Sequence, residues 1–388
     1  MFARRTAWHD QPNRFTQALD ARRRSGEPLF DLSESNPTRC RFDYPHWLLD
    51  ALPDPRALDY APEARGLRSA REAVSAYYAA RGEKADPDRI LLATSTSEAY
   101  SWIFRLLCDP GDEVLVPAPS YPLFEYLAAI QDVTPVRYPL FYDHGWHVDL
   151  HALEQALTPR TRAIMLVNPN NPTGSYVREA ELKGLNRLCA ARELALVADE
   201  VFLDFAFDQA QRPSLVRNDA VLTLSLSGLS KIAGLPQMKV AWLVASGPAD
   251  QVNAALARLE VIADTYLSLN TPLQLALPAL LAFRSEFQAQ LGKRVRANLA
   301  ALDAALRAVP SVVRLEADGG WYAVLRVPQT AADEDVAVAL LEQGVVVHPG
   351  HFYDFAAEGY LVVSLLPAPE RFAEGAARLT ATLRQRFR

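Results

Sequence analysis

Between residues 90 and 244 the chain alternates short apolar segments with segments of helical character. The apolar segments are rich in Val, Leu, Ile and Ala, and they cover residues 90–93, 113–116, 163–167, 194–198, 220–226 and 240–244. Strands that are apolar throughout, with helices between them, are typical of a mostly parallel sheet that is buried on both faces. The pattern therefore predicts an α/β fold whose large domain is a mostly parallel sheet sandwiched by helices.

A second, smaller domain is expected outside this region. The chain has 388 residues, which is more than a single small core requires. After residue 271 the sequence becomes helical, and it then contains predicted strands at 312–315, 321–325 and 361–365 and a last helix over 369–387. We expect a large domain over residues 45–270 and a small α+β domain formed by residues 1–44 and 271–388.

Composition limits the partners and the location. The formal net charge is −6 and the arginines are dispersed, which argues against a nucleic-acid partner. Three unevenly spaced cysteines, no apolar leader and no run long enough to cross a membrane predict a cytoplasmic protein without a membrane partner. His144, His147 and His151 surround a predicted loop at Gly145-Trp146, so no metal site is expected.

Polar residues follow the predicted strands, and ligands of parallel sheets bind at that edge. Thr94-Ser95-Thr96-Ser97 follows the first strand and leads into a helix for which Ser97 is the expected N-cap. Backbone N–H groups at a helix N-terminus bind anions such as phosphate. Capping alone is the commoner use of Ser and Thr at such positions, so both interpretations stay open.

The later strands are followed by four further groups of chemical interest. These are Tyr121, the turn Asn168–Gly174, Asp199, and Lys231 within residues 227–234. A buried carboxylate needs a cationic partner, and a desolvated lysine becomes a usable nucleophile. Each group has a plain alternative, such as a packed tyrosine or a solvated loop lysine. Together they match what pyridoxal phosphate requires: a lysine for the Schiff base, and a carboxylate that keeps the pyridine nitrogen protonated.

The motifs around these residues resemble those of the class I/II aminotransferases, which belong to the fold type I pyridoxal-phosphate superfamily. Asn168-Pro169-Asn170-Asn171-Pro172-Thr173-Gly174 is similar to the signature NPxNPTG. Ser230-Lys231 with Gly234-Leu235-Pro236 resembles the lysine motif, and Asp199-Glu200-Val201 resembles the DEVY segment. The similarity extends from about residue 31 to residue 388. It implies a homodimer with shared active sites, and a ping-pong transfer of an amino group from an amino acid or amine to a 2-oxo acid or carbonyl compound.

The resemblance also implies a role for each matching residue. Lys231 forms the Schiff base and moves the substrate proton, Asp199 pairs with the pyridinium, and Asn171 bonds the phenolic oxygen O3′. Tyr121 stacks on the ring. The implied phosphate ligands are Ser95, Thr96, Ser97 and Ser230, together with Tyr60 from the neighbouring subunit.

Three positions depart from the pattern of the resemblance. Phe202 replaces the DEVY tyrosine, whose hydroxyl donates to O3′. Lys239 replaces a phosphate-binding arginine, and it supplies charge without the bidentate fork. Val362 stands where an arginine grips the substrate α-carboxylate, so either another group binds the carboxylate or the substrate has none at that position.

The substrate half of the site is accordingly the open part of the prediction. Candidate substrate contacts are Asn36, Arg39, Arg41, Arg65, His348, His351 and Trp321. A surface position for the arginines, an idle loop position for the histidines and core packing for Trp321 are the alternatives. A pyridoxal-phosphate-dependent lyase, decarboxylase or cyclase remains possible, as does a non-catalytic protein with this fold, and the sequence does not identify the substrate.

Overall fold

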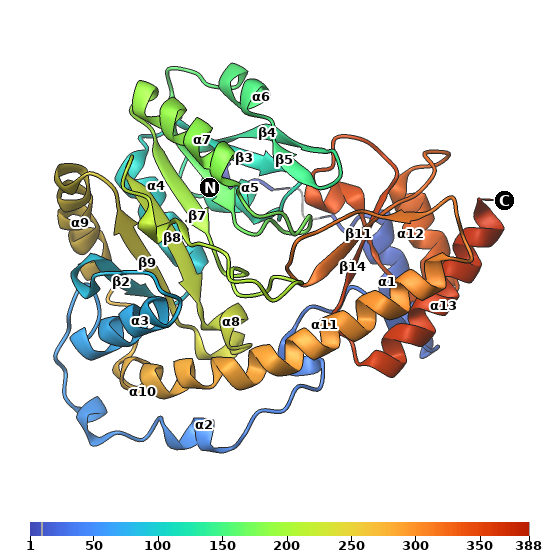
Figure 1. Cartoon of the computed structure of the whole chain (residues 1–388), viewed down its shortest axis with the longest axis horizontal. Helices are drawn as coiled ribbons and strands as arrows, with labels where there is room; N and C mark the ends of the chain where they lie inside the picture. The colour runs from blue at the N-terminus through green and yellow to red at the C-terminus, as the bar shows by residue number, and fades with distance from the viewer. Residues whose placement is uncertain (9–10, 388) are drawn as a thin grey trace.

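An eight-stranded sheet forms the centre of the larger part of the molecule (Figure 1). The computed structural model describes residues 1–8 and 11–387. The strand order across this sheet is β2-β9-β8-β7-β6-β3-β4-β5. The strands are β2 (Ile90–Ala93), β3 (Glu113–Ala118), β4 (Thr134–Tyr142), β5 (Trp146–Val148), β6 (Thr161–Val167), β7 (Ala195–Asp199), β8 (Thr223–Gly228) and β9 (Ala241–Ser246).

The direction of the strands decides which residues meet at one edge. Strands β4, β3, β6, β7 and β8 run parallel to one another, so the predicted mostly parallel α/β sheet is confirmed. Strand β9 is antiparallel to both β8 and β2, and β5 is antiparallel to β4. Because β2 therefore points the same way as β8, the carboxyl ends of β2, β3, β6, β7 and β8 share one edge, and β9 begins there.

Helices cover both faces of this sheet because alternate apolar side chains of each strand point to opposite faces. On one face Met165 packs in a core cluster with α4 (Thr96–Leu107) and α9 (Ala249–Asp264). On the other face Ile164 and Leu166 pack with α6 (Leu150–Gln155) and α7 (Glu179–Arg192). The strands β2 and β9 also pack against α3 (Arg68–Ala80) and α10 (Thr271–Ala282). The expected sandwich is thus present.

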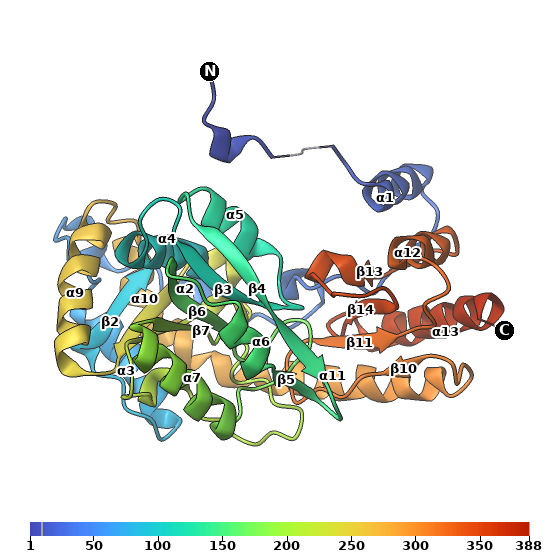
Figure 2. The ribbon, with the colours of Figure 1, turned by 90° about the horizontal axis from the view of Figure 1, so that it is seen from above.

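The smaller part contains a four-stranded sheet of order β10-β11-β14-β13, which is antiparallel throughout. Its strands are β10 (Val313–Arg314), β11 (Tyr322–Arg326), β13 (His348–Pro349) and β14 (Tyr360–Ser364). The helices around it are α1 (Arg14–Ser25), α11 (Arg284–Leu306), α12 (Asp333–Glu342) and α13 (Pro369–Arg386). Figure 2 shows this sheet beside the large one, with α11 reaching from one part to the other.

The amino-terminal segment joins the smaller part. Strand β1 (Phe30–Asp31) pairs in parallel with β12 (Val345–Val346), and α1 packs on α12. This pairing is the arrangement expected of a small domain made from both ends of the chain, while the boundaries at residues 45 and 271 stay a prediction. Within the described residues, no helix is both long and apolar enough to cross a membrane.

One local prediction was wrong, and one alternative does not hold. The segment around Gly145-Trp146 is a hairpin between β4 and β5 rather than a plain loop, with His144 and Gly145 at φ values of 45° and 129° in its turn. Lys231, for which a solvated loop position was the plain alternative, lies instead in the short helix α8 (Leu229–Ile232), which starts directly after β8. Strand β8 itself begins at Thr223 and continues to Gly228, so the helix follows without an intervening loop.

Candidate active site

The edge where the strands end brings the predicted residues together. The backbone N–H of Asn168 donates to the carbonyl oxygen of Asp199 over 2.8 Å, which joins the ends of β6 and β7. The N–H of Leu229 donates to the carbonyl oxygen of Val240 over 2.9 Å, which ties the start of α8 to the start of β9. Lys231, Asp199 and the Asn168–Gly174 turn are therefore positioned by backbone bonds of one sheet edge.

Lys231 occupies an apolar environment with aromatic walls. Its Nζ lies 5.5 Å from the centroid of the Trp321 ring and 5.8 Å from that of Phe202. Burial lowers the pKa of the Lys231 ammonium, and the negative charge of Asp199 opposes this shift. A lysine with a lowered pKa holds a larger fraction of free amine at neutral pH, which is what a nucleophilic amine needs.

Asp199 ends β7 and is held by two donors. The hydroxyl of Tyr100 donates to its Oδ2 over 3.0 Å, and the N–H of Val201 donates to its Oδ1 over 3.2 Å. Burial raises the pKa of this carboxyl to about 6, although both hydrogen bonds and Lys231 favour the charged form. The carboxylate is thus ionised at neutral pH and is available to a cationic partner.

Tyr100 was missed in the sequence. It lies on α4 among the buried residues of that helix, and its ring packs on Phe104 and Phe124. In a sequence such a tyrosine is indistinguishable from a core residue, because its apolar ring follows the helical period. Only the position of its hydroxyl against Asp199 distinguishes it.

The turn after β6 is buried and attached to the loop that carries Tyr121. The Nδ2 of Asn170 donates to the carbonyl oxygen of Pro119 over 3.0 Å, and the Oγ of Ser120 donates to Asn170 Oδ1 over 3.2 Å. Asn171 is buried, and within the described chain its Oδ1 has no hydrogen-bond partner. Tyr121 has a side chain that is 48% exposed, so one part of its ring is open to a ligand.

Two glycines allow the Trp321 segment to reach this turn. Gly174 has φ +71°, and a Cβ on it would lie 2.3 Å from the carbonyl oxygen of Gly319. The N–H of Gly319 donates to the carbonyl oxygen of Gly174 over 3.0 Å. Only a residue without a side chain fits here, and the close approach places Trp321 beside Lys231 and Phe202.

The expected phosphate-binding residues lie at the same edge, with one correction. Ser95 and not Ser97 is the N-cap of α4, because the Oγ of Ser95 accepts from the N–H of Glu98 over 3.1 Å. Thr96 and Ser97 are the first two residues of this 12-residue helix. An N-cap side chain accepts from the backbone N–H three residues later, so the cap falls two residues earlier than predicted.

Two further phosphate candidates flank the helix α8. Ser230 is part of that helix, and Lys239 is exposed with φ +50° just before β9. Because β9 is antiparallel to β8, its start lies at the edge where the other strands end. The phosphate-binding role of both residues stays a prediction.

The arginines proposed for the substrate carboxylate have other contacts. Arg39 is exposed and lies 4.0 Å from the carboxylate of Glu34. Arg65 donates to Glu260 over 2.6 Å and to the carbonyl oxygen of Asp88 over 2.7 Å. These contacts give no support to either arginine as the carboxylate ligand.

The remaining substrate candidates divide between surface and core. Asn36 accepts from the N–H of Thr38 over 3.1 Å, and His351 is exposed. Val362 is 1% exposed within β14, so the position of the missing arginine is filled by an apolar side chain. Trp321 is fully buried and packs its ring on Phe202, with centroids 5.2 Å apart, so it serves as both core and wall of the site.

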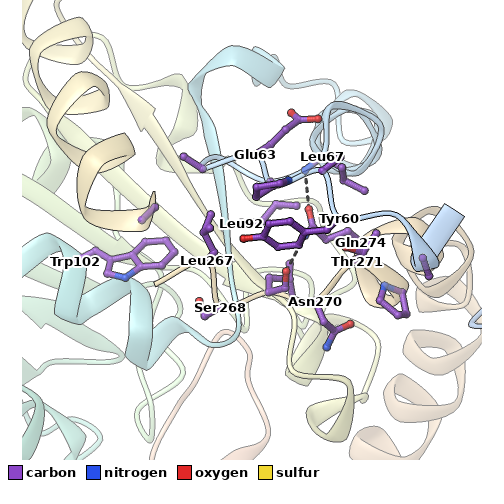
Figure 3. A pocket seen from close by; sticks show the side chains of 18 residues that line it. Tyr60, Glu63, Leu67, Leu92, Trp102, Leu267, Ser268, Asn270, Thr271 and Gln274 are labelled. Atoms are coloured by element: carbon purple, nitrogen blue, oxygen red, sulfur yellow. Dashed lines mark hydrogen bonds between the residues drawn. The ribbon is translucent and has the colours of Figure 1, made fainter. Parts of the chain in front are cut away.

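Tyr60 lies in a separate surface pocket (Figure 3). This pocket has a volume of about 330 Å³, and its lining combines residues 57–67 with Trp102 and residues 263–274. The side chain of Tyr60 is 86% exposed. Lys231, Asp199 and Asn171 are not among the residues of the described chain that line it. The chain therefore does not bring Tyr60 into its own Lys231 cluster.

Comparison with known proteins gives consistent results. The family model described as aminotransferase class I and II matches residues 29–378. An alanine aminotransferase of Mycobacterium tuberculosis is 29% identical over 367 residues, which cover 91% of this chain and 85% of that protein. A glutamate-pyruvate aminotransferase of Escherichia coli is 32% identical over 256 residues, which cover 65% of this chain and 63% of that protein.

Solved structures repeat the fold. The structure of an alanine aminotransferase from Pyrococcus furiosus superposes with a TM-score of 0.89 at 22% identity, covering 99% of this chain and 100% of that one. At this identity the similarity shows that the two chains share a fold.

Proposed function

Because the chain belongs to the class I and II aminotransferases, whose members use pyridoxal phosphate for transamination, we propose that it transfers the amino group of alanine to a 2-oxo acid other than pyruvate. The transaminase chemistry and the cofactor follow from the family match over residues 29–378. The substrate pair is our proposal, and it is supported by the names of the relatives from Mycobacterium tuberculosis and Escherichia coli. The observation that carries the transaminase chemistry in this chain is the Lys231 amine of lowered pKa beside the Asp199 carboxyl.

The residues at the sheet edge fit pyridoxal phosphate. Asn171 Oδ1 is a buried polar atom without a partner in the described chain, which suits a group that a ligand completes. The Asp199 carboxylate is buried and anchored by Tyr100, so it suits a protonated pyridine nitrogen. Bound pyridoxal phosphate supplies an aldehyde carbon that condenses with amines and a ring that withdraws electrons from the substrate Cα.

The reaction then depends on the proton chemistry of two side chains. Burial lowers the pKa of the Lys231 ammonium and so favours the free amine, the form that can condense with a carbonyl and, once released, take a proton from the substrate Cα and return one elsewhere. Asp199, with a pKa of about 6, stays ionised at neutral pH and holds a proton on its cationic partner. The rings of Trp321 and Phe202 place apolar surface beside the Lys231 amine and so reduce its contact with water.

We also propose that two copies of the chain form a homodimer in which each copy supplies Tyr60 to the other. The exposure of Tyr60 and its separation from the Lys231 cluster support this arrangement. Large apolar side chains close in sequence to residues that line this pocket are exposed as well, at Leu58 (90%), Val261 (68%) and Tyr266 (51%). A surface of this kind is typical of a protein interface.

A cytoplasmic location is proposed on the support of the cysteines. Cys40, Cys108 and Cys189 are all free thiols in this structure. Burial raises the pKa of the Cys189 thiol to about 12, which keeps it protonated and unreactive. Free, protonated thiols are typical of proteins in a reducing compartment.

A half-reaction tests the proposed function. The holoenzyme is mixed with alanine in the absence of any 2-oxo acid, and the visible spectrum and the products are measured. Transamination predicts conversion of the cofactor to its amine form with one pyruvate released per site, and restoration of the spectrum when a 2-oxo acid is added. Release of ammonia or carbon dioxide without the amine form would instead indicate a lyase or a decarboxylase, and the transaminase proposal would be wrong.

A further inference from the structure

His348 lies directly beside the position of the missing arginine. In the antiparallel pair β13–β14, the register places His348 opposite Val362. Residues opposite each other in such a pair point to the same face of the sheet, with Cβ atoms about 4.5–5.5 Å apart. Thus a histidine stands on the same face as, and next to, the buried valine that replaces the carboxylate-binding arginine.

The ring of His348 is held in place by Tyr353. The Tyr353 hydroxyl oxygen lies 3.0 Å from His348 Nδ1, and the two ring centroids are 5.9 Å apart. Burial raises the pKa of Tyr353 well above its ordinary value, so this group remains a phenol and can donate to Nδ1. A histidine that accepts at Nδ1 carries its proton on Nε2, which is then a donor for a ligand.

Tyr322 lies on the same face of the small sheet and extends it toward Lys231. It pairs with Ser364, two residues from the row of Val324, Val362 and His348. Its ring contacts the ring of Tyr353 at a centroid distance of 6.5 Å and that of Phe202 at 6.4 Å. Phe202 in turn lies 5.8 Å from Lys231 Nζ, so a continuous set of aromatic rings joins the His348 face to the nucleophile.

The electrostatics of this region rest on few groups. The negative charge of Asp31 favours a protonated His348, while burial of the imidazole lowers its pKa and opposes protonation. The neighbouring Tyr322 hydroxyl has a pKa raised to about 12, mainly by burial, and it too remains a donor. Among the candidate arginines, Arg39 pairs with Glu34 and is exposed. Neutral donors are therefore what this face offers to a carboxylate.

We propose that His348, oriented by Tyr353, binds the α-carboxylate of the substrate in place of the missing arginine, with the Tyr322 hydroxyl as a second donor. This inference rests on the proposed transamination of an α-amino acid. Single hydrogen bonds from neutral groups bind a carboxylate less strongly than a bidentate guanidinium does. The consequence is a site that binds the α-carboxylate of its substrate with modest affinity.

The test measures binding without turnover. The holoenzyme is titrated with 2-methylalanine, which has no Cα proton to lose, and with tert-butylamine, which carries a methyl group in place of the carboxylate. The change of the visible spectrum gives both dissociation constants, and their ratio reports recognition of the carboxylate alone. We expect the wild type to prefer 2-methylalanine and His348→Leu to lose roughly 10- to 100-fold of that preference, since a hydrogen bond to a charged group is removed.

Three further variants separate recognition from structural damage. Tyr353→Phe keeps the ring and removes the orienting hydroxyl, so it is expected to lose part of the same preference. His348→Gln retains a donor and should rescue part of what His348→Leu loses. His151→Leu changes an exposed histidine on α6, outside the proposed site, and should leave the preference unchanged. If His348→Leu does not fold, Tyr353→Phe and His348→Gln decide the question.

Two results would overturn the inference. The first is an equal affinity of the wild type for 2-methylalanine and tert-butylamine. The second is an undiminished preference for 2-methylalanine in His348→Leu. If His348→Leu does not fold, the second result is an undiminished preference in both Tyr353→Phe and His348→Gln. Either result is compatible with stoichiometric pyruvate formation from alanine, so the proposed transamination can stand while the role of His348 falls. If the half-reaction with alanine fails while the preference for the carboxylate is intact, the proposed transamination falls and the role of His348 in binding the carboxylate stands.

Discussion

At the scale of single residues, the chemistry depends on the charge of Asp199. In Asp199→Asn the side chain keeps its shape but no longer holds a proton on a cationic partner. We expect kcat to fall roughly 10²- to 10³-fold, as when one preorganised electrostatic group is removed from an active site. The matched control is Tyr100→Phe, which removes the 3.0 Å hydrogen bond to Asp199 and leaves the charge. It should cost about tenfold or less. Equal losses in the two variants, measured by steady-state kinetics, would contradict this role of the charge.

Phe202 sets a second property at this scale. Because it has no hydroxyl to donate to the phenolic oxygen of the cofactor, that oxygen should hold the proton it shares with the Lys231 nitrogen more tightly. Phe202→Tyr is therefore expected to lower the pKa at which the visible spectrum of the holoenzyme changes. A titration of the spectrum against pH measures this directly. A pKa in the wild type that is equal to or below that of the variant would show the explanation to be wrong.

The sequence was most informative about residues whose type is fixed by chemistry. Lys231, Asp199 and Asn171 could be named because their polar side chains interrupt apolar strand ends in a specific motif. Tyr100 could not be named, because its role depends on a contact with Asp199, which is far away in the chain. His348 could be named as a candidate substrate contact, but its hydrogen bond with Tyr353 and its place opposite Val362 could not be predicted. The N-cap of α4 was placed two residues late because Ser95 and Ser97 are equivalent candidates in the sequence. Only the hydrogen bond that the Glu98 N–H donates to Ser95 identifies the N-cap.

At the scale of elements, Glu200 joins the end of β7 to its surroundings. It is buried and accepts from the Leu215 N–H over 2.9 Å and from Asn168 Nδ2 over 3.0 Å, with Ser214 as a third donor. Burial raises its pKa from an ordinary value of 4.5 to about 7. The native state therefore keeps a proton that the unfolded chain releases between pH 4.5 and 7.

This shift predicts the direction of a pH effect on stability. A carboxyl whose pKa is raised in the native state contributes to the free energy of unfolding below pH 4.5. This contribution, about 3 kcal/mol for Glu200, is lost as the pH rises from 4.5 through 7. In Glu200→Gln this contribution is absent, so the free energy of unfolding should fall less between pH 4.5 and 7.5. Urea unfolding of the apoprotein across this range checks it. Parallel curves for variant and wild type would contradict the raised pKa.

The contact between Gly174 and Gly319 makes a further prediction for the elements. Gly174→Ala combines a positive φ with a Cβ that would lie 2.3 Å from a backbone oxygen. Gly82 is the matched control, because its φ is +73° and nothing lies within 4 Å of an added Cβ. We expect Gly82→Ala to destabilise the fold by about 1 kcal/mol, and Gly174→Ala to cost at least twice as much and to weaken cofactor retention. Equal losses of stability for Gly174→Ala and Gly82→Ala in thermal unfolding would contradict this prediction, because the Gly174 turn would then accommodate the added methyl group by a small shift.

The elements themselves were predicted where the sequence pattern is strong. The strands β2, β3, β6, β7, β8 and β9 stand out because most of their residues are apolar and buried, and α13 was predicted as the last helix of the chain. The hairpin β4–β5 was missed because β4 lies near the edge of the sheet, where only one of its nine residues is buried and two are prolines, so it lacks the continuous apolar pattern of the central strands. Strands of two residues, such as β1 and β12, are defined by their pairing and leave no local pattern.

At the scale of the whole molecule, the proposed dimer predicts that two inactive variants restore each other. In Lys231→Ala the nucleophile is lost, and in Tyr60→Ala the group donated to the other copy is lost. A hybrid dimer of the two has one site with Lys231 from one chain and Tyr60 from its partner, and that site is intact. Random exchange makes half of the dimers hybrid with one good site of two, so about a quarter of wild-type sites are expected.

The outcome distinguishes the two possible arrangements. Activity and cofactor retention of the mixture are compared with those of each variant alone after dissociation and reassembly. No gain on mixing would mean that Tyr60 acts within its own chain or not at all. The control mixture of Lys231→Ala with Gly82→Ala should give half of the wild-type sites, because only one of its two chains lacks a catalytic group.

The central claim concerns Lys231, and chemical trapping tests it most directly. The holoenzyme is reduced with borohydride, which fixes the cofactor to whichever amine it has condensed with, and the digested peptides are weighed by mass spectrometry. The chain has five lysines, at positions 84, 183, 231, 239 and 293, and the account predicts the added mass on Lys231 alone. The same mass on Lys239 or another lysine, or its persistence in Lys231→Ala, would contradict the account.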